Sequence, residues 1–402
     1  MNMITVNEAS KAIMNHEHPL GIVEMPFESS LGFILAEAIY ADRDFPPFNR
    51  VSMDGIAIHY DSWALTKSPQ KIEGVAPAGQ AQVVLKNTHN CIEVMTGSIL
   101  PKNCDTVVRY EDVAIENGHA RITIEEVTKG KNVHIQGIDG QKGDLLIGKG
   151  TLISPAEIGI LATTGKSTVQ VYQNHRIVLI STGDELVPVD QIPLAHQIRM
   201  SNSFQISTFL RSKGYEVSIR HLNDEAELMK KSIEGLMDDY DVIILSGGVS
   251  KGKFDYVPQV LQDLGVEKKF HKVKQRPGKP FWFGTAPNCT VFALPGNPIS
   301  SFVCSVRYVL PWLEKNRFRS KPKPLYARLG DDVAFKPDLS FFLEVSLKFN
   351  EEGQIIAHPQ RGNGSGDLAN APKVDAYLEL PQGKDLYEKG EVHRLYPFRN
   401  FY

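Results

Sequence analysis

Residues 241–298 constrain the fold more than any other part of the chain. The segment DVIILS (residues 241–246) is almost wholly apolar and rich in β-branched residues, which is typical of a buried strand in a parallel sheet. Gly247 and Gly248 follow directly, and a helical pattern comes after them. A strand that enters a helix through a glycine turn exposes backbone N–H groups at the carboxyl edge of the sheet. Such a turn suits a phosphate or another oxyanion.

A second unit of the same kind lies further along the chain. The segment TVFALPGNP (residues 290–298) again joins an apolar strand to a turn, and the basic segment HKVKQRPGKP (residues 271–280) precedes it. We expect the two turns to converge on one crevice, where open α/β sheets bind their ligands. A glycine turn alone is equally well explained as a tight connection that needs positive φ. The combination of segments is therefore the informative feature.

The pattern from His175 onward alternates strands with helices, which predicts parallel βαβ units with both faces of the sheet covered. Glycine after the last apolar position closes the first of these helices, as is common at helix ends. The expected strands are RIVLIS, YEVSIR, DVIILS, KKFHKVK and TVFALP, and the expected helices are residues 203–213, 224–239, 255–264 and 298–313.

The rest of the chain suggests three further parts. Residues 1–44 have apolar spacing of the helical kind, over Val6–Ile13 and over Ser30–Ile39, and residues 142–172 contain a helix that begins at Ser154-Pro155. We expect these flanks to form one helical domain, interrupted by an inserted β domain at residues 45–141. An α/β domain at residues 173–318 and a C-terminal β-barrel at residues 319–402 would complete an α/β multidomain fold.

Composition limits the cellular setting. The net charge is −3, which gives no general electrostatic reason to bind nucleic acid or an anionic membrane. The N-terminus lacks a secretory pattern, and no apolar stretch is long enough to span a membrane. The four cysteines show no CxxC spacing, so we expect free thiols in a cytoplasmic protein.

Acidic residues in glycine-rich turns are the candidates for metal chemistry. Any one of them is more often a helix cap or a solvated carboxylate, but together with nearby cations they suit Mg²⁺ and a phosphate substrate. Glu185 stands out because it follows a buried strand, where sites form in parallel sheets. The acids are Asp54, Asp139, Asp184, Glu185 and Asp255, and the cations are Lys272, Lys274, Arg276 and Lys279.

Seven motifs in order carry a resemblance to a known family. They are PPFxxxxMDGIA, VMTGxxLP, GxDxxxGD, LISTGDEL, SGGVSxGxxD, RPGKP and LPGNP. The chain resembles the MoeA family of molybdopterin molybdenumtransferases, to which gephyrin and plant Cnx E domains are similar. The resemblance covers nearly the whole chain and is weakest in the last eighty or so residues.

The resemblance implies the four domains above, including a three-layer α/β molybdopterin-binding domain. It also implies a homodimer whose cleft lies between the α/β domain of one subunit and the β insertion of the other. The family inserts molybdate into adenylylated molybdopterin with release of AMP and requires Mg²⁺. Partners would include a molybdopterin adenylyltransferase and molybdoenzyme acceptors or chaperones.

Carried over motif by motif, the family's important residues fall on ten positions of this chain. The catalytic candidates are Asp54, Thr96, Asp139, Glu185 and Asp255, of which Glu185 and Asp255 would hold Mg²⁺ or orient water. The other transferred positions are Lys272, Arg276, Lys279, Pro295 and Pro298. Lys279 would contact molybdate together with Ser300, and we assign the turn of Gly247, Gly248 and Ser250 to a substrate phosphate.

The chain departs from the family pattern at three positions. Met200 stands where an aspartate is frequent, Arg276 replaces a lysine, and Glu344 replaces an arginine in FFLEVSL. We expect Arg361 and the turn Gly362–Gly366 to supply the missing oxyanion contacts, with Glu344 turned away or paired to a lysine. An ordinary hairpin loop with a solvated arginine is the alternative.

These departures also keep a second class of function open, a non-catalytic relative that binds molybdopterin or serves as a scaffold.

Overall fold

The computed structural model describes residues 3–249, 256–318 and 323–399. They form two compact units, which we treat separately. The first contains residues 1–25, 32–36 and 170–402, and the second contains residues 26–31 and 37–169. The candidate positions Ser250 and Asp255 lie outside the described residues.

The centre of the first unit is a six-stranded sheet with the order β17-β14-β18-β22-β21-β19. The strands β17 (Val217–Leu222), β14 (Ile177–Thr182), β18 (Val242–Ser246) and β22 (Cys289–Leu294) are parallel. The prediction of buried parallel strands is confirmed for these four segments. Two antiparallel strands, β21 (Trp282–Ala286) and β19 (Glu267–Phe270), complete the sheet. The expectation of parallel units is therefore wrong for β19, which overlaps the expected strand KKFHKVK and runs antiparallel to β21.

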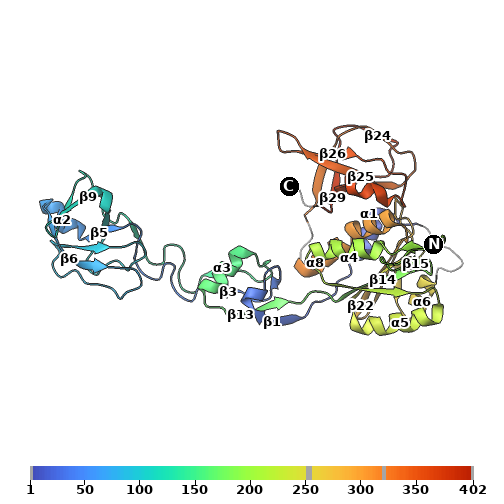
Figure 1. Ribbon diagram of the computed structural model, residues 1–402, viewed down its shortest axis with the longest axis horizontal. Coiled ribbons are helices and arrows are strands. Elements are labelled where there is room, and N and C mark those ends of the chain that lie inside the picture. The colour runs from blue at the N-terminus through green and yellow to red at the C-terminus, as the bar shows by residue number, and fades with distance from the viewer. Residues whose placement is uncertain (1–2, 250–255, 319–322, 400–402) are drawn as a thin grey trace. The chain divides into compact units, whose positions relative to one another are not determined.

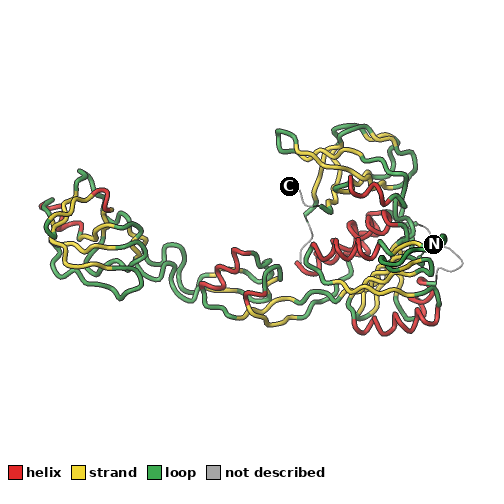
Figure 2. The backbone as a smooth tube through the Cα atoms, viewed as in Figure 1, coloured by secondary structure: helices red, strands yellow, loops and turns green. Residues whose placement is uncertain are grey.

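Helices cover both faces of this sheet, as Figures 1 and 2 show. Side chains of successive strand residues point to opposite faces, so Ile244 packs with one helical layer and Leu245 with the other. The first layer contains α1 (Val6–Met14), α4 (Asn202–Ser212) and one long helical segment. This segment consists of α7 (Pro298–Cys304), a π-helical turn (Ser305–Val309) and α8 (Leu310–Phe318). The second layer contains α5 (Ala226–Asp239) and α6 (Val257–Asp263).

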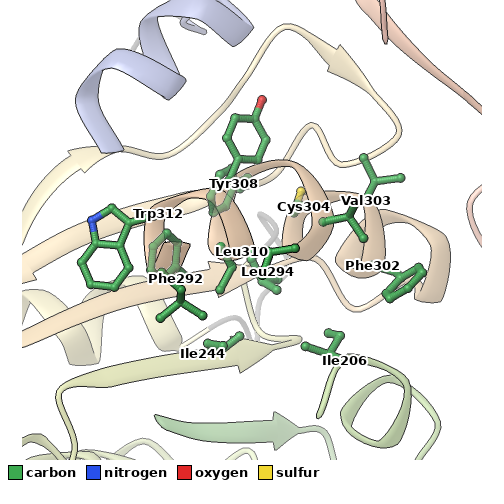
Figure 3. Packing of buried hydrophobic residues seen from close by; sticks show 14 of the residues in the cluster. Ile206, Ile244, Phe292, Leu294, Phe302, Val303, Cys304, Tyr308, Leu310 and Trp312 are labelled. Atoms are coloured by element: carbon green, nitrogen blue, oxygen red, sulfur yellow. The ribbon is translucent and has the colours of Figure 1, made fainter. Parts of the chain in front are cut away.

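Aromatic side chains fill the first layer. Figure 3 shows Trp312 and Phe292 in contact, with Tyr308 and Phe302 further along the helical segment. All of them are buried, and burial of such large apolar surfaces is the main stabilising term in a core. This packing fixes the helix that begins at Pro298 and so fixes the turn before it.

A closed five-stranded barrel follows, formed by β25 (Ser340–Phe349), β26 (Ile355–Pro359), β23 (Leu325–Leu329), β29 (Val392–Pro397) and β27 (Ala376–Leu380). Pairing of β25 with β27 closes it, as the C-terminal strand pattern predicted. Two short strands, β24 (Val333–Ala334) and β28 (Leu386–Tyr387), pair beside it. The strand β20 (Gln275–Arg276) leaves the α/β layer and pairs with β25.

A separate three-stranded sheet has the order β1-β13-β2, in which β1 (Ile22–Pro26) and β2 (Ile34–Leu35) flank β13 (Thr168–Tyr172). The prediction of a helix at Ser30–Ile39 is therefore wrong, because a short apolar run fits a strand as well as a helix. Pairing of Leu35 with Val171 decides the outcome. The short strands β15 (Leu186–Val187) and β16 (Ile198–Arg199) pair with each other.

The second unit is built on the sheet β8-β5-β7-β6-β10-β9. It also contains α3 (Pro155–Thr163), which begins at the predicted cap Ser154. The four-domain division stays a prediction. The remaining elements are β3 (Ile39–Tyr40), β4 (Arg50–Val51), β5 (Gly55–Ile58), α2 (Tyr60–Thr66), β6 (Gln70–Ala76), β7 (Cys91–Val94), β8 (Thr106–Arg109), β9 (Val113–Glu116), β10 (His119–Ile122), β11 (Val133–His134) and β12 (Leu145–Ile147).

Candidate active site

A cavity of about 1670 Å³ lies at the carboxyl ends of β14, β18 and β22, wholly within the first unit. Its floor is formed by three turns, one after each strand, and its far wall by the C-terminal barrel. The predicted convergence of the two strand-to-turn units on one crevice is confirmed. The candidates that line this cavity are Glu185, Gly247, Gly248, Arg276, Lys279, Pro295, Pro298, Ser300, Arg361 and the turn Gly362–Gly366.

The turn after β18 requires glycine at both of its first positions. Gly247 has a φ of 108° and Gly248 a φ of 64°, values that side chains rarely allow. A Cβ on Gly247 would lie 2.8 Å from the Thr182 carbonyl oxygen, and one on Gly248 would lie 2.8 Å from the Val257 side chain. The backbone of this turn therefore sits directly against the end of β14.

The turn after β22 is tied to its neighbour by Asn202, the first residue of α4. The Asn202 Nδ2 atom donates to Ser246 Oγ at 3.0 Å and to the Gly296 carbonyl at 2.6 Å. This one amide thus bridges the ends of β18 and β22. An ideal Cβ on Gly296 would lie 3.6 Å from the Gly247 Cα atom, so the two turns are in contact.

The segment Gln275–Pro280 carries two cations into the cavity, Arg276 and Lys279, and both are exposed. Buried Gln275 holds the segment, because its Nε2 donates to the carbonyls of Pro277 and Gly278 while its Oε1 accepts from Tyr308. Lys272 is described but is not among the residues that line the cavity, and its carbonyl accepts from Ile4. The basic segment thus contributes two of its expected cations.

Glu185 lies at the rim beyond β14. Its carboxylate folds back over Gly183, where a Cβ would be 2.5 Å from Oε2. Within the described residues, no group of three or more His, Cys, Asp or Glu side chains is arranged to hold a metal ion. One carboxylate does fit Mg²⁺ when substrate phosphates and water provide the other ligands, which is common for this ion.

The barrel contributes Glu344 and the loop Arg361–Gly366 to the far wall. Glu344 forms no ion pair with a lysine in the described part of the chain, so of the two expected arrangements the pairing with a lysine is wrong. Its Oε1 atom is buried without a hydrogen-bond partner among those residues. Burial raises the pKa of Glu344, the Asn370 amide partly opposes this, and the charge of Asp367 adds to it.

The second unit brings two of its three candidates together. Thr96 donates to Asp54 Oδ1 from its backbone N at 2.6 Å and from its hydroxyl at 2.7 Å. These hydrogen bonds, the backbone one first, lower the pKa of the Asp54 carboxyl. The pairing of β5 with β7 sets Gly55 opposite Val94 and so joins the MDG and MTG motifs. Asp139 instead pairs with His134 at 3.0 Å.

Some residues of the cavity were not singled out from the sequence. Asn202, Gln275 and Asn297 fix the turns, and Arg199 lines the wall together with Glu185. Asn297 stands inside the LPGNP motif, so an asparagine between two prolines was an available signal. The burial of Gln275 had no such signal.

Comparison with known proteins gives a consistent result along the chain. Residues 4–165 match the MoeA N-terminal region (domain I and II), residues 178–315 a probable molybdopterin binding domain, and residues 326–398 the MoeA C-terminal region (domain IV). In the described residues, no helix is both long and apolar enough to cross a membrane.

Individual relatives match over all or nearly all of their length. A molybdopterin molybdenumtransferase from Synechocystis is 39% identical over 98% of this chain and 100% of its own. One from Staphylococcus aureus is 29% identical over 97% of this chain and 94% of its own. The crystal structure of a molybdopterin biosynthesis MoeA protein from Pyrococcus horikosii superposes with a TM-score of 0.84, at 29% identity and complete coverage of both chains.

Proposed function

Because the chain belongs to the MoeA family of molybdopterin molybdenumtransferases, we propose that it acts in molybdenum-cofactor biosynthesis. The reaction inserts molybdate into adenylylated molybdopterin and releases AMP. The observation that carries the proposal is one cavity in which glycine turns, two or more cations and an exposed carboxylate face the same space. Both substrates are anionic, and this combination suits phosphate and oxyanion groups.

We assign the parts of the cavity to parts of the substrates. The turn at Gly247 and Gly248 binds a substrate phosphate through backbone N–H groups that follow Gly247, as glycine turns commonly do. The Gly247 N–H itself donates to the Leu294 carbonyl at 3.2 Å. Lys279 and Ser300 contact molybdate, with Arg276 beside them. Pro295 and Pro298 shape the turn that carries Ser300 into the wall. Binding both substrates in one cavity lowers the entropic cost of their reaction.

Glu185 is the candidate for work on the phosphoanhydride. Its carboxylate would orient the water that cleaves the bond, or contribute one ligand to Mg²⁺ together with Asp255. When bound, magnesium neutralises phosphate charge.

The second unit enters the proposal through assembly. We propose a homodimer in which Asp54, Thr96 and Asp139 of one subunit complete the cavity of the other. Asp54, Thr96 and Asp139 belong to motifs shared with the family, but the cavity lies wholly within the first unit and they belong to the second. A second subunit would explain how these residues act in the same reaction. Sedimentation should give twice the chain mass of 44.8 kDa, and a monomer that retains full activity would exclude a shared site.

The experiment for the reaction follows AMP. Purified protein is incubated with adenylylated molybdopterin, with and without molybdate, and released AMP is measured together with molybdenum bound to molybdopterin. Insertion predicts AMP and molybdenum cofactor in equal amounts when molybdate is present. A non-catalytic binding protein would retain the adenylylated ligand intact, and that result would overturn the proposal.

A further inference from the structure

The loop Arg361–Gly366 is held by the barrel on one side. Asp367 Oδ2 accepts from the Asn363 backbone N at 2.8 Å and from its side-chain Nδ2 at 3.2 Å. Gly362 lies close to the barrel, because a Cβ there would be 3.1 Å from both Glu344 Oε2 and Asn370 Nδ2. These contacts hold the loop at Gly362 and Asn363, and every residue of the loop lines the cavity.

The α/β layer holds the same loop near its C-terminal end, through Ser365. The Asn297 Nδ2 atom donates to Ser365 Oγ at 2.9 Å, and the Ile299 backbone N donates to the Ser365 carbonyl at 3.1 Å. Asn297 occupies the N-cap position of α7, yet its side chain makes no capping hydrogen bond to the helix. Asparagine at this position usually caps its own helix, and here the barrel loop satisfies a helix N–H instead.

The contact sits where it affects the cavity more than the core. Asn297 is exposed and Ser365 is half-buried, and both line the cavity wall. Arg361 belongs to the same loop, four residues before Ser365. On its other side, the turn that carries Asn297 is tied to α4 through Asn202. The chain of contacts therefore runs from the floor of the cavity to its far wall.

We propose that Asn297 and Ser365 form a latch that positions the Arg361 loop over the cavity and so sets the affinity for the oxyanion substrate. Asn297 is a positioning residue in this arrangement, because it acts through the loop. The functional part rests on the proposed function, in which the oxyanion is molybdate. The structural part does not depend on it.

The test compares Asn297→Ala with Asn350→Ala in the full-length protein. Asn350 is a matched control, because its side chain also makes an exposed hydrogen bond across a short turn, to Gln354, away from the cavity wall. Hydrogen exchange reports the amides of Ile299 and residues 363–367. Steady-state assays report the molybdate concentration for half-maximal cofactor formation, and thermal unfolding shows that both variants fold.

If the latch exists, Asn297→Ala should exchange its amide hydrogens faster than the wild type at Ile299 and in the loop. Asn350→Ala should exchange them at the wild-type rate. The molybdate requirement should rise about two- to tenfold, the worth of one neutral hydrogen bond, with a smaller change in the maximal rate. Ser365→Ala should give the same result, and the double variant should be no worse than either single one.

Arg361→Ala is the reference for the loop's own role. Loss of a charge-assisted contact should raise the molybdate requirement roughly ten- to a hundredfold. Unchanged exchange in Asn297→Ala would overturn the latch, whatever the protein binds. Faster exchange with an unchanged requirement would overturn its role in affinity. If Arg361→Ala were also unaffected, the fault would lie in the proposed oxyanion role of the loop.

Discussion

Two of the polar contacts between the C-terminal barrel and the α/β layer differ in almost every physical respect. Arg307 of the π-helical turn pairs with Glu379 of β27 at 3.0 Å, with side-chain exposures of 4% and 14%. Tyr396 also donates to Glu379, and its ring lies 4.9 Å from the Arg307 guanidinium. Asn297 and Ser365 form a neutral contact at the cavity wall.

The difference separates stability from substrate binding. A buried charge left without its partner is costly, so the Arg307–Glu379 pair fixes how the barrel packs on the helices. An exposed neutral hydrogen bond contributes little to folding, so the Asn297–Ser365 contact is free to serve the cavity. We therefore expect variants of the two contacts to have opposite effects on unfolding and on molybdate use.

The largest expected effect on stability belongs to Glu379→Ala. Removing the carboxylate leaves the Arg307 guanidinium charged, because arginine does not deprotonate in proteins, and nearly fully buried without its partner. The free energy of unfolding should therefore fall by about 3–5 kcal/mol. Urea denaturation followed by circular dichroism measures this loss. The molybdate requirement of the folded fraction should stay close to that of the wild type.

A matched control replaces both charged partners with apolar residues. Arg307→Met combined with Glu379→Leu should recover much of the loss, since apolar replacement of a buried pair is frequently tolerated. If Glu379→Ala instead raised the molybdate requirement without lowering stability, the proposed division between the two contacts would be wrong.

A smaller effect on stability is expected for Glu344→Gln. This variant tests whether the Glu344 carboxyl in the cavity wall titrates with a raised pKa. The pKa of Glu344 is raised above 4.5 by burial, so the native state binds its proton more tightly than the unfolded state. This contribution to stability is complete below pH 4.5 and is lost as pH rises through the native pKa. Above that window the variant should be more stable than the wild type, by about 1 kcal/mol or less.

Unfolding midpoints measured from pH 4 to pH 8 check this prediction. The wild type and Glu344→Gln should converge toward the acidic end and diverge toward the alkaline end. Curves that stay parallel over the whole range would show that Glu344 does not titrate as its surroundings imply.

The sequence predicted the parts of the fold in which local pattern and tertiary structure agree. Segment DVIILS became β18 because its residues are apolar on both faces, and Ser154-Pro155 began α3. At Ser30–Ile39 the apolar spacing suited helix and strand equally, and pairing with β13 decided it. Strand β21 was missed because its five residues follow a turn rich in proline and glycine, and its antiparallel pairing leaves no βαβ signature.

The candidate site divides in a similar way. The strand-end rule predicted the location of Glu185, Gly247 and the turn at Pro295, because parallel strands bring their carboxyl ends to one edge of a sheet. Composition did not reveal that Lys272 lies off the cavity wall while Arg276 lies on it. The Asn297–Ser365 contact joins residues 68 positions apart through packing of the barrel on the helices, which no local pattern encodes.

The most direct test of the account is turnover by Glu185→Gln, with Glu234→Gln on α5 as the control. Both residues are exposed carboxylates of the α/β layer, but Glu185 alone of the two lines the cavity. AMP release should fall by orders of magnitude in Glu185→Gln while its unfolding free energy changes by no more than about 0.5 kcal/mol. Near-normal AMP release from Glu185→Gln would remove this carboxylate from the catalytic set and contradict the assignment of the cavity.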